Sequence, residues 1–186
     1  MNLIFQESSL SDRIEDTITE SATLDQLALN FQHTLQSALH TLPPAVVAAL
    51  RGDWLGHPVH PIKVHLPLGG WMIAALLDFA PLGNTPEKRQ QYQKAADTAL
   101  LLGTVGGAGA VATGWVEWST ARGQARRTGL IHGALNETAF LLNVGSLIAR
   151  KKGRRGLGKA LSGAGLGLAL AGGMLGGQLV YRHRMG

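Results

Sequence analysis

The chain has 186 residues, of which 45% are hydrophobic, and it carries a formal net charge of +5 at pH 7. It contains no cysteine, which excludes disulfide bonds, thiolate metal centres and cysteine nucleophiles. The basic residues lie in short clusters between long apolar runs and not along one polar face, so the pattern favours a membrane protein over a nucleic-acid-binding protein.

The composition changes sharply near residue 51. Residues 1–50 have no glycine, six acidic residues and one basic residue, whereas the rest of the chain holds all 25 glycines. Leucines recur at helical spacing over residues 24–42, Thr23 and Gln26 form a possible capping box, and Pro43 ends that helix. We therefore expect an acidic helical segment over residues 1–50, soluble or on a membrane surface, followed by a membrane domain over residues 51–186.

Four apolar runs approach the length of about 20 residues that crosses the hydrocarbon layer of a bilayer. The predicted spans cover residues 62–82, 96–117, 128–149 and 160–181, the first with Asp78 inside it and the third with Glu137. The predicted fold is all-α, a four-helix transmembrane bundle preceded by a non-spanning helical segment. A soluble bundle with a core of small residues is the alternative, because the mean hydropathy is only +0.09.

Glycines recur four residues apart along the predicted spans. This spacing lets helix backbones approach closely, either within the bundle or in a homo-oligomer, and a flat cofactor lying against the glycines is a second interpretation. The N-terminal helices offer another surface for a protein partner. The glycine pairs are Gly103 and Gly107, Gly129 and Gly133, Gly163 and Gly167, Gly172 and Gly176, and Gly173 and Gly177.

Four spans would put both termini on the same side of the membrane. The connections on the opposite side carry nine basic residues, at positions 88–94 and 150–159, against seven on the side of the termini. Because basic residues concentrate in cytoplasmic loops, we predict an inner-membrane protein with both termini outside.

The same topology gathers polar residues at the end of the bundle where the termini lie. At about 1.5 Å of rise per helical residue, side chains from all four spans reach a similar depth there. Ionisable groups at such depth are costly and usually face the bundle interior or a cavity. The candidate site consists of His57, His60, His65, Trp115, Glu117, His132, Asn136 and Gln178.

Several functions fit these residues. Imidazoles could ligate haem b in an electron carrier, with His132 opposite His60 or His65 and with Asn136 or a backbone carbonyl orienting the second ring nitrogen. Alternatively, His57, His60, His65, His132 and Glu117 could bind a divalent metal. A third reading is a non-catalytic structural or assembly subunit in which the histidines only bond to loop carbonyls. Whether the protein is an enzyme stays open.

Several motifs in order resemble a known family. They are WLGHPVHP, LPLG, RRTGLIHGALN and LGGQLVYR, and they run from about Asp53 to Arg182 with helices of small residues between them. This part of the chain resembles the bacterial integral membrane proteins grouped as domain of unknown function 2231.

The resemblance implies a four-helix membrane domain. Some members continue into a Rieske-type iron–sulfur domain, which implies electron transfer, but the absence of cysteine excludes such a domain from these residues. The family's histidines match His57, His60 and His132, and its asparagine matches Asn136. Many members have an acidic residue where this chain has His65 and a histidine where it has Gln178, so His65 could replace that lost ligand.

Overall fold

The computed structural model describes residues 10–80 and 82–185, which form helices and no strand. The first nine residues of the predicted N-terminal segment lie outside this range. The helices are α1 (Leu10–Glu20), α2 (Ala22–His40), α3 (Pro44–Arg51), α4 (His60–Lys63), α5 (His65–Phe79), α6 (Pro86–Trp118), α7 (Gly123–Lys151) and α8 (Arg155–Tyr181), with a 3₁₀ turn at Asp53–Leu55.

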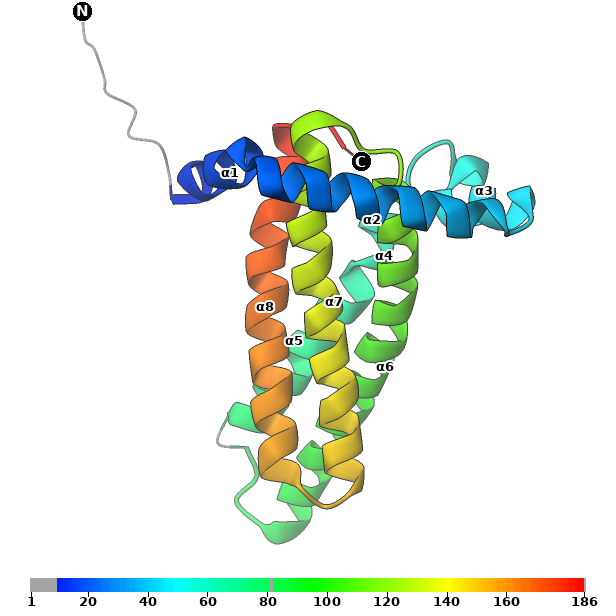
Figure 1. Ribbon diagram of the computed structural model, residues 1–186. Helices are drawn as coiled ribbons and strands as arrows, with labels where there is room; N and C mark the ends of the chain where they lie inside the picture. The colour runs from blue at the N-terminus through cyan, green and yellow to red at the C-terminus, as the bar shows by residue number, and fades with distance from the viewer. Residues whose placement is uncertain (1–9, 81, 186) are drawn as a thin grey trace, which may run out of the picture.

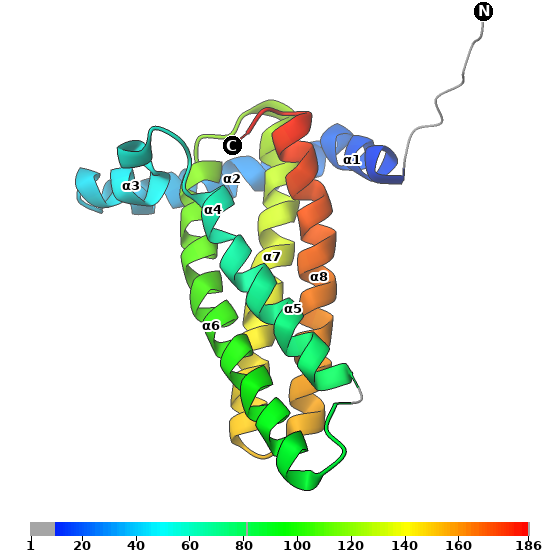
Figure 2. The ribbon, with the colours of Figure 1, turned by 180° about the vertical axis from the view of Figure 1, so that it is seen from behind.

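The four long helices α5 to α8 run side by side with alternating direction, and α1 to α3 lie across one end of them (Figures 1 and 2). The closest pairs are α5 with α6 and α7 with α8, while α6 with α7 and α5 with α8 complete the arrangement. The chain thus forms two helical hairpins that pack together. The C-terminus and the helices α1 to α3 lie at the same end.

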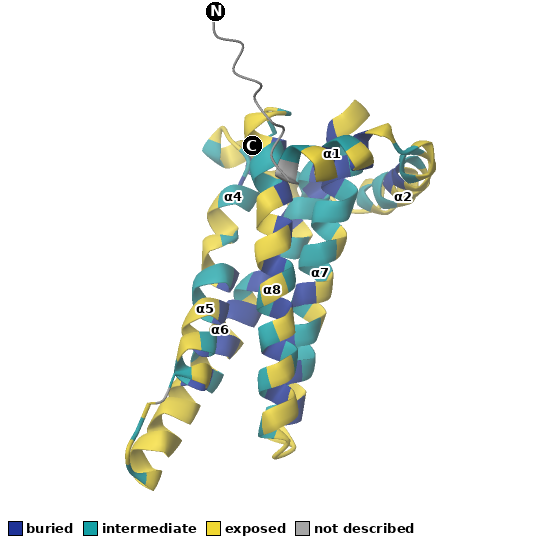
Figure 3. Ribbon diagram, turned by 90° about the vertical axis from the view of Figure 1, so that its left-hand side faces the viewer, coloured by how far each residue is buried: buried dark blue, intermediate teal, exposed yellow. Residues whose placement is uncertain are grey.

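Three segments are long and apolar enough to cross a membrane by length and composition, namely His60–Phe79, Pro86–Trp118 and Arg155–Tyr181. Helix α7 has 29 residues but is more polar. Exposed positions lie on the outer faces of these helices (Figure 3), and many of them carry large apolar side chains, as expected for surfaces in lipid. They include Leu66, Ile73, Leu76, Leu101, Leu102, Val105, Leu141, Ile148 and Leu170.

Several helix boundaries differ from the sequence prediction. Helix α6 begins at Pro86, ten residues before the predicted span, because the Thr85 side chain accepts a hydrogen bond from the Lys88 backbone N–H and caps a polar turn. The predicted capping box at Thr23 is wrong. Ser21 caps α2 by accepting from the Leu24 N–H, 3.3 Å away. Beyond Pro43 the chain forms a further helix, α3.

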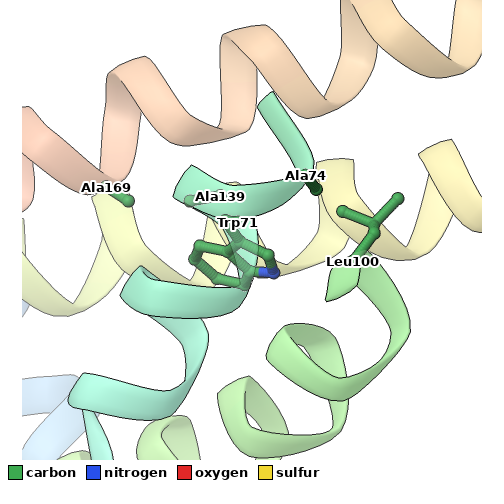
Figure 4. Close-up of a cluster of buried hydrophobic side chains, with 5 residues drawn as sticks. All are labelled: Trp71, Ala74, Leu100, Ala139 and Ala169. Carbon is green, nitrogen blue, oxygen red and sulfur yellow. The ribbon is translucent and has the colours of Figure 1, made fainter. Parts of the chain in front are cut away.

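The centre of the molecule is a cluster of small and large apolar residues from all four long helices (Figure 4). The Trp71 indole packs against Gly103 and Gly107 of α6, and its N–H donates to the Thr104 hydroxyl over 3.3 Å. The backbones of α5 and α6 meet where Gly70 faces Gly103. The other members of the cluster are Ala74, Leu100, Ala139 and Ala169.

A network of ion pairs joins the helices at the end away from the termini. The Asp78 carboxylate of α5 and the Arg150 guanidinium of α7 are almost completely buried and pair with each other. Arg155 of α8 also pairs with Asp78, at 3.0 Å, and both arginines pair with Asp97 of α6. Because each buried charge has opposite-sign partners, the network ties all four long helices together at this end.

The acidic N-terminal helices pack on basic residues at the other end. Asp25 of α2 accepts hydrogen bonds from Arg126 at 2.9 Å and from Arg127 at 2.8 Å. The buried Glu15 of α1 pairs with His183 and accepts from Thr128. Complementary charge therefore holds α1 and α2 against the start of α7 and the end of α8.

Further contacts join α2 to the turn between α6 and α7. The Gln32 side-chain amide donates to the carbonyls of Trp118 and Ala121, and that of Gln36 donates to Ser119. The Phe31 ring lies 5.0 Å from the Trp115 ring, between centroids. Helices α1 and α2 thus pack on the ends of the long helices.

The close approach of α5 to α6 can be tested with two neighbouring glycines. A Cβ at Gly70 would lie 2.6 Å from the Gly103 Cα and 2.7 Å from the Ala99 carbonyl oxygen, whereas a Cβ at Gly69 would meet nothing within 4 Å. We expect Gly70→Ala to destabilise the fold by about 1–3 kcal/mol through overpacking. Gly69→Ala should be neutral or slightly stabilising, because alanine favours helix. Thermal denaturation in detergent measures both, and equal midpoints would contradict the packing.

The docking of α2 should depend on pH. Hydrogen bonds from Arg126 and Arg127 hold the pKa of Asp25 below its usual value of 3.8. Because the pKa of Asp25 is lower in the folded state than in the unfolded state, its ion pairs stabilise the fold fully at pH values above the unfolded pKa. This stabilisation disappears as the pH falls through the folded pKa. Hydrogen exchange of α2 should therefore accelerate below about pH 4, and less so in Asp25→Asn, which should exchange faster already at neutral pH. The same acid response in both proteins would contradict this role.

Candidate functional site

A cavity of about 350 Å³ opens among α4, α5, α6, α7 and α8 at the end where α1 to α3 lie. Trp71 and Ala169 of the central cluster form its inner limit, and exposed residues of α8 such as Tyr181 line its rim. The lining is mostly apolar, with a few polar side chains pointing inward. Those polar residues are His60, Glu117, His132 and Asn136.

Two histidines face this cavity with the same hydrogen-bond arrangement. His60 Nδ1 lies 2.9 Å from the Ala110 carbonyl oxygen of α6, and His132 Nδ1 lies 2.8 Å from the Gly172 carbonyl oxygen of α8. A carbonyl oxygen only accepts, so Nδ1 carries the proton in both rings. In the neutral ring Nε2 then has a free lone pair, and among the described residues it has no hydrogen-bond partner.

The two rings lie close together across the cavity. Their centroids are 6.3 Å apart and their planes are perpendicular. A metal that bonds one imidazole nitrogen on each side at about 2 Å holds the two centroids roughly 6 Å apart. The spacing of this pair therefore matches ligation by both rings, and the Nδ1 bonds to backbone carbonyls are those that usually orient ligating histidines.

Each imidazole occupies the space that a glycine leaves on the neighbouring helix. A Cβ at Gly114 would lie 2.8 Å from His60 Cε1, and one at Gly176 would lie 3.0 Å from His132 Cε1. Each of these glycines follows by four residues the carbonyl that its histidine contacts. The ring passes over the glycine to reach the carbonyl one turn earlier.

The other polar residues of the cavity are held in related ways. The Asn136 amide donates to the His132 carbonyl over 2.8 Å and fills the space beside Gly172. Trp115 packs on Gly133, and Trp118 lies over Gly129. The Trp118 indole N–H donates to the backbone carbonyl of Arg126. Oε2 of Glu117 is buried and has no hydrogen-bond partner among the described residues. It is available to accept a hydrogen bond from a bound molecule.

Three candidates from the sequence do not line the cavity. His57 and His65 are exposed, and their Nδ1 atoms bond to the nearby carbonyls of Pro58 and Ile62. Gln178 faces the N-terminal segment, where its amide lies 3.4 Å from an Asp12 carboxylate oxygen. His57 lies in the connection before α4, and His65 and Gln178 lie on sides of α5 and α8 that do not face the cavity.

The divalent-metal interpretation requires three or more ligating side chains close together. Within residues 10–80 and 82–185, no three His, Asp or Glu residues are placed to hold a metal ion. Of the five residues proposed for such a site, the cavity contains His60, His132 and Glu117. A molecule or ion bound in this cavity would therefore meet two imidazoles and one carboxylate that is not grouped with them.

Sequence reasoning missed the supports of the two histidines. Gly114 was not singled out, and Gly176 was singled out for helix packing or for a flat cofactor but not as the support of a histidine. These supporting glycines could have been predicted by searching the neighbouring helix for a glycine at the same depth as each imidazole ring.

Comparison with known proteins gives one match. The chain matches no curated protein and no solved structure. Residues 56–186 match the family described as predicted membrane protein (DUF2231), and this match includes both cavity histidines, Asn136 and Glu117. The match covers well over half of the chain and includes its apolar helices. The protein therefore belongs to the DUF2231 family of predicted membrane proteins.

Proposed function

We propose that α7 crosses the membrane together with the three apolar helices. Helix α6 ends at the level of α1 to α3 and α8 begins at the opposite end, so α7, which joins them through short turns, runs the full length between (Figure 1). Its polar residues His132 and Asn136 line the cavity, and Arg150 lies in the ion-pair network. The resemblance to a bacterial family favours the bacterial inner membrane, and the basic residues at the α7–α8 turn favour an orientation with both termini outside.

We propose that the protein is a membrane electron carrier that binds one haem b between His60 and His132. The observation that carries the proposal is the matched pair of imidazoles, each fixed through Nδ1 and each with Nε2 unpaired, 6.3 Å apart between centroids. When bound, haem iron supplies reversible one-electron transfer.

The surroundings of the pair fit a planar macrocycle. Seven glycines line the cavity, and a Cβ at Gly173 or Gly177 would meet nothing within 4 Å, so α8 presents an open flat surface there. Trp71, Leu68 and Val64 add apolar contact area. The helix carbonyls of Ala110 and Gly172 would hold the imidazoles in orientation, and burial among apolar residues would limit access of water.

Haem is favoured over a divalent metal because haem needs two protein ligands, whereas zinc sites use three or four. It is favoured over a purely structural role because a structural histidine gains nothing from an unpaired Nε2 that faces a cavity. For His57 and His65, bonded to local carbonyls, the structural role is sufficient.

Absorbance spectra of the purified protein test the haem proposal. Protein from haem-replete cells should show a Soret band that shifts on reduction with dithionite, and close to one haem per chain by pyridine haemochrome. Both His60→Ala and His132→Ala should lower haem content at least about tenfold, because each removes a ligand. His57→Ala and His65→Ala are matched controls from the same segment and should keep the band.

A colourless preparation without iron would contradict the proposal, as would a spectrum unchanged in His132→Ala. Metal analysis of the same samples separates the alternatives. Zinc or another divalent metal in stoichiometric amount, lost in Glu117→Gln, would favour the divalent-metal site instead.

The glycine beneath His132 gives a second test. Gly176→Val should push the His132 ring away from the Gly172 carbonyl, because even a Cβ at position 176 would lie 3.0 Å from Cε1 of that ring. We expect a fall in haem content with little loss of folded protein. Gly167→Val, on the same helix but facing open space, is the control and should keep the haem of the parent. Full haem content in Gly176→Val would show that the ring is not held there.

A further inference from the structure

A second, polar cavity lies at the end of the molecule away from the histidines. It has a volume of about 350 Å³ and is formed by the end of α5, the connection to α6, the first turns of α6 and the start of α8. Its polar residues are Asp78, Arg89, Tyr92, Gln93 and Lys159. Nothing in the proposed electron carrier uses this cavity.

The charges around this cavity do not balance. Two carboxylates, those of Asp78 and Asp97, face four cationic side chains in the cavity and the ion-pair network beside it. Asp78 is already shared among Arg150, Arg155 and Lys159, and Nε of Arg155 is buried without a hydrogen-bond partner. Arg89 is exposed, but Arg150 is buried and Arg155 and Lys159 are half-buried, so three cations of low exposure face two carboxylates. This surplus is costly, and an anion placed among these groups would offset it.

Arg89 supplies a free cation to the cavity. Its side chain makes no hydrogen bond or ion pair with any of the described residues, although its backbone is held in the first turn of α6. A guanidinium presents paired N–H donors that match the oxygens of a phosphate. Tyr92 and Lys159 line the same space, and their hydroxyl and ammonium groups are further hydrogen-bond donors.

The cavity also lies at the boundary of the apolar part of the molecule. Leu76 and Phe79, at the end of α5, expose 66% and 60% of their surface, and Lys159 Nζ lies 5.9 Å from the centre of the Phe79 ring. Tyrosine and basic residues at this level are typical of the membrane interface. A phosphate in the cavity would thus sit where lipid headgroups lie, with acyl chains along the exposed face of α5.

We infer that this cavity binds the phosphate of an anionic phospholipid through Arg89, Tyr92 and Lys159. Basic pockets between spanning helices are known to recognise acidic headgroups. The bound lipid would bring α5, α6 and α8 together and complete the charge balance of the Asp78 network. Inorganic phosphate shares this chemistry and is the other possible source.

Native mass spectrometry of the full chain tests the inference. The protein is purified from nanodiscs that contain equal amounts of phosphatidylglycerol and phosphatidylcholine, and retained lipid is measured for the parent, Arg89→Gln and Lys152→Gln. Arg89 lies outside the ion-pair network, so its substitution should leave the fold intact, which circular dichroism checks. Lys152 is an exposed cation at the same end that does not line the cavity.

We expect the parent to retain phosphatidylglycerol in preference to phosphatidylcholine, Arg89→Gln to lose about tenfold or more of it, and Lys152→Gln to match the parent. Thermal protection by inorganic phosphate equal to that by phosphatidylglycerol would support the same phosphate site with free phosphate as its ligand. Equal retention of the two lipids, or equal loss in both variants, would overturn the inference. Haem content is independent of all these outcomes.

Discussion

Rings and amides of one helix rest in the spaces that glycines leave on the next, and the arrangement of the whole molecule depends on this fit. Trp71 lies against Gly103 and Gly107, and His132 lies against Gly176. Without a hydrophobic driving force between helices in lipid, such close contact is a main source of association. The same contacts that hold the helices together therefore also set the position of the two imidazoles.

The two ends of the molecule are stabilised by different forces. At the end where α1 to α3 lie, Asp25 pairs with Arg126 and Arg127 where water still reaches the carboxylate, and the buried Glu15 pairs with His183. At the opposite end, Asp78 and Arg150 pair inside the protein, where removal of either charge leaves the other without compensation. The first set of ion pairs holds α1 and α2 across the end of the long helices, and the second set joins α5, α6, α7 and α8 to one another.

Much of the architecture could be predicted because helical length and alternating direction determine depth. Depth alone put His60, His132, Asn136 and Glu117 at one end, and the structure brings these four to one cavity. Depth says nothing about rotation around the helix axis, and for that reason His65 and Gln178 shared the predicted level but face elsewhere.

Long-range pairing was the other missing information. The basic stretch that begins at Arg150 was interpreted as a signal for membrane topology, whereas Arg150 and Arg155 turn inward to Asp78, more than 70 residues earlier in the chain. A charge in an apolar run indicates that a partner exists but does not identify it. Similarly, α6 extends beyond its apolar part because Thr85 and Pro86 form a good helix start, which a search for apolar runs does not consider.

The equal division of the histidine site between the two hairpins has a thermodynamic consequence. His60 is anchored to α6 within one hairpin, and His132 is anchored to α8 within the other. Neither hairpin alone holds two imidazoles, so a ligand that bonds both is a cross-link between the halves of the molecule. Its binding free energy adds directly to the stability of the docked state, by RT ln(1 + [L]/Kd) for free ligand concentration [L]. Assembly of the membrane domain and loading of its ligand would then be a single coupled equilibrium.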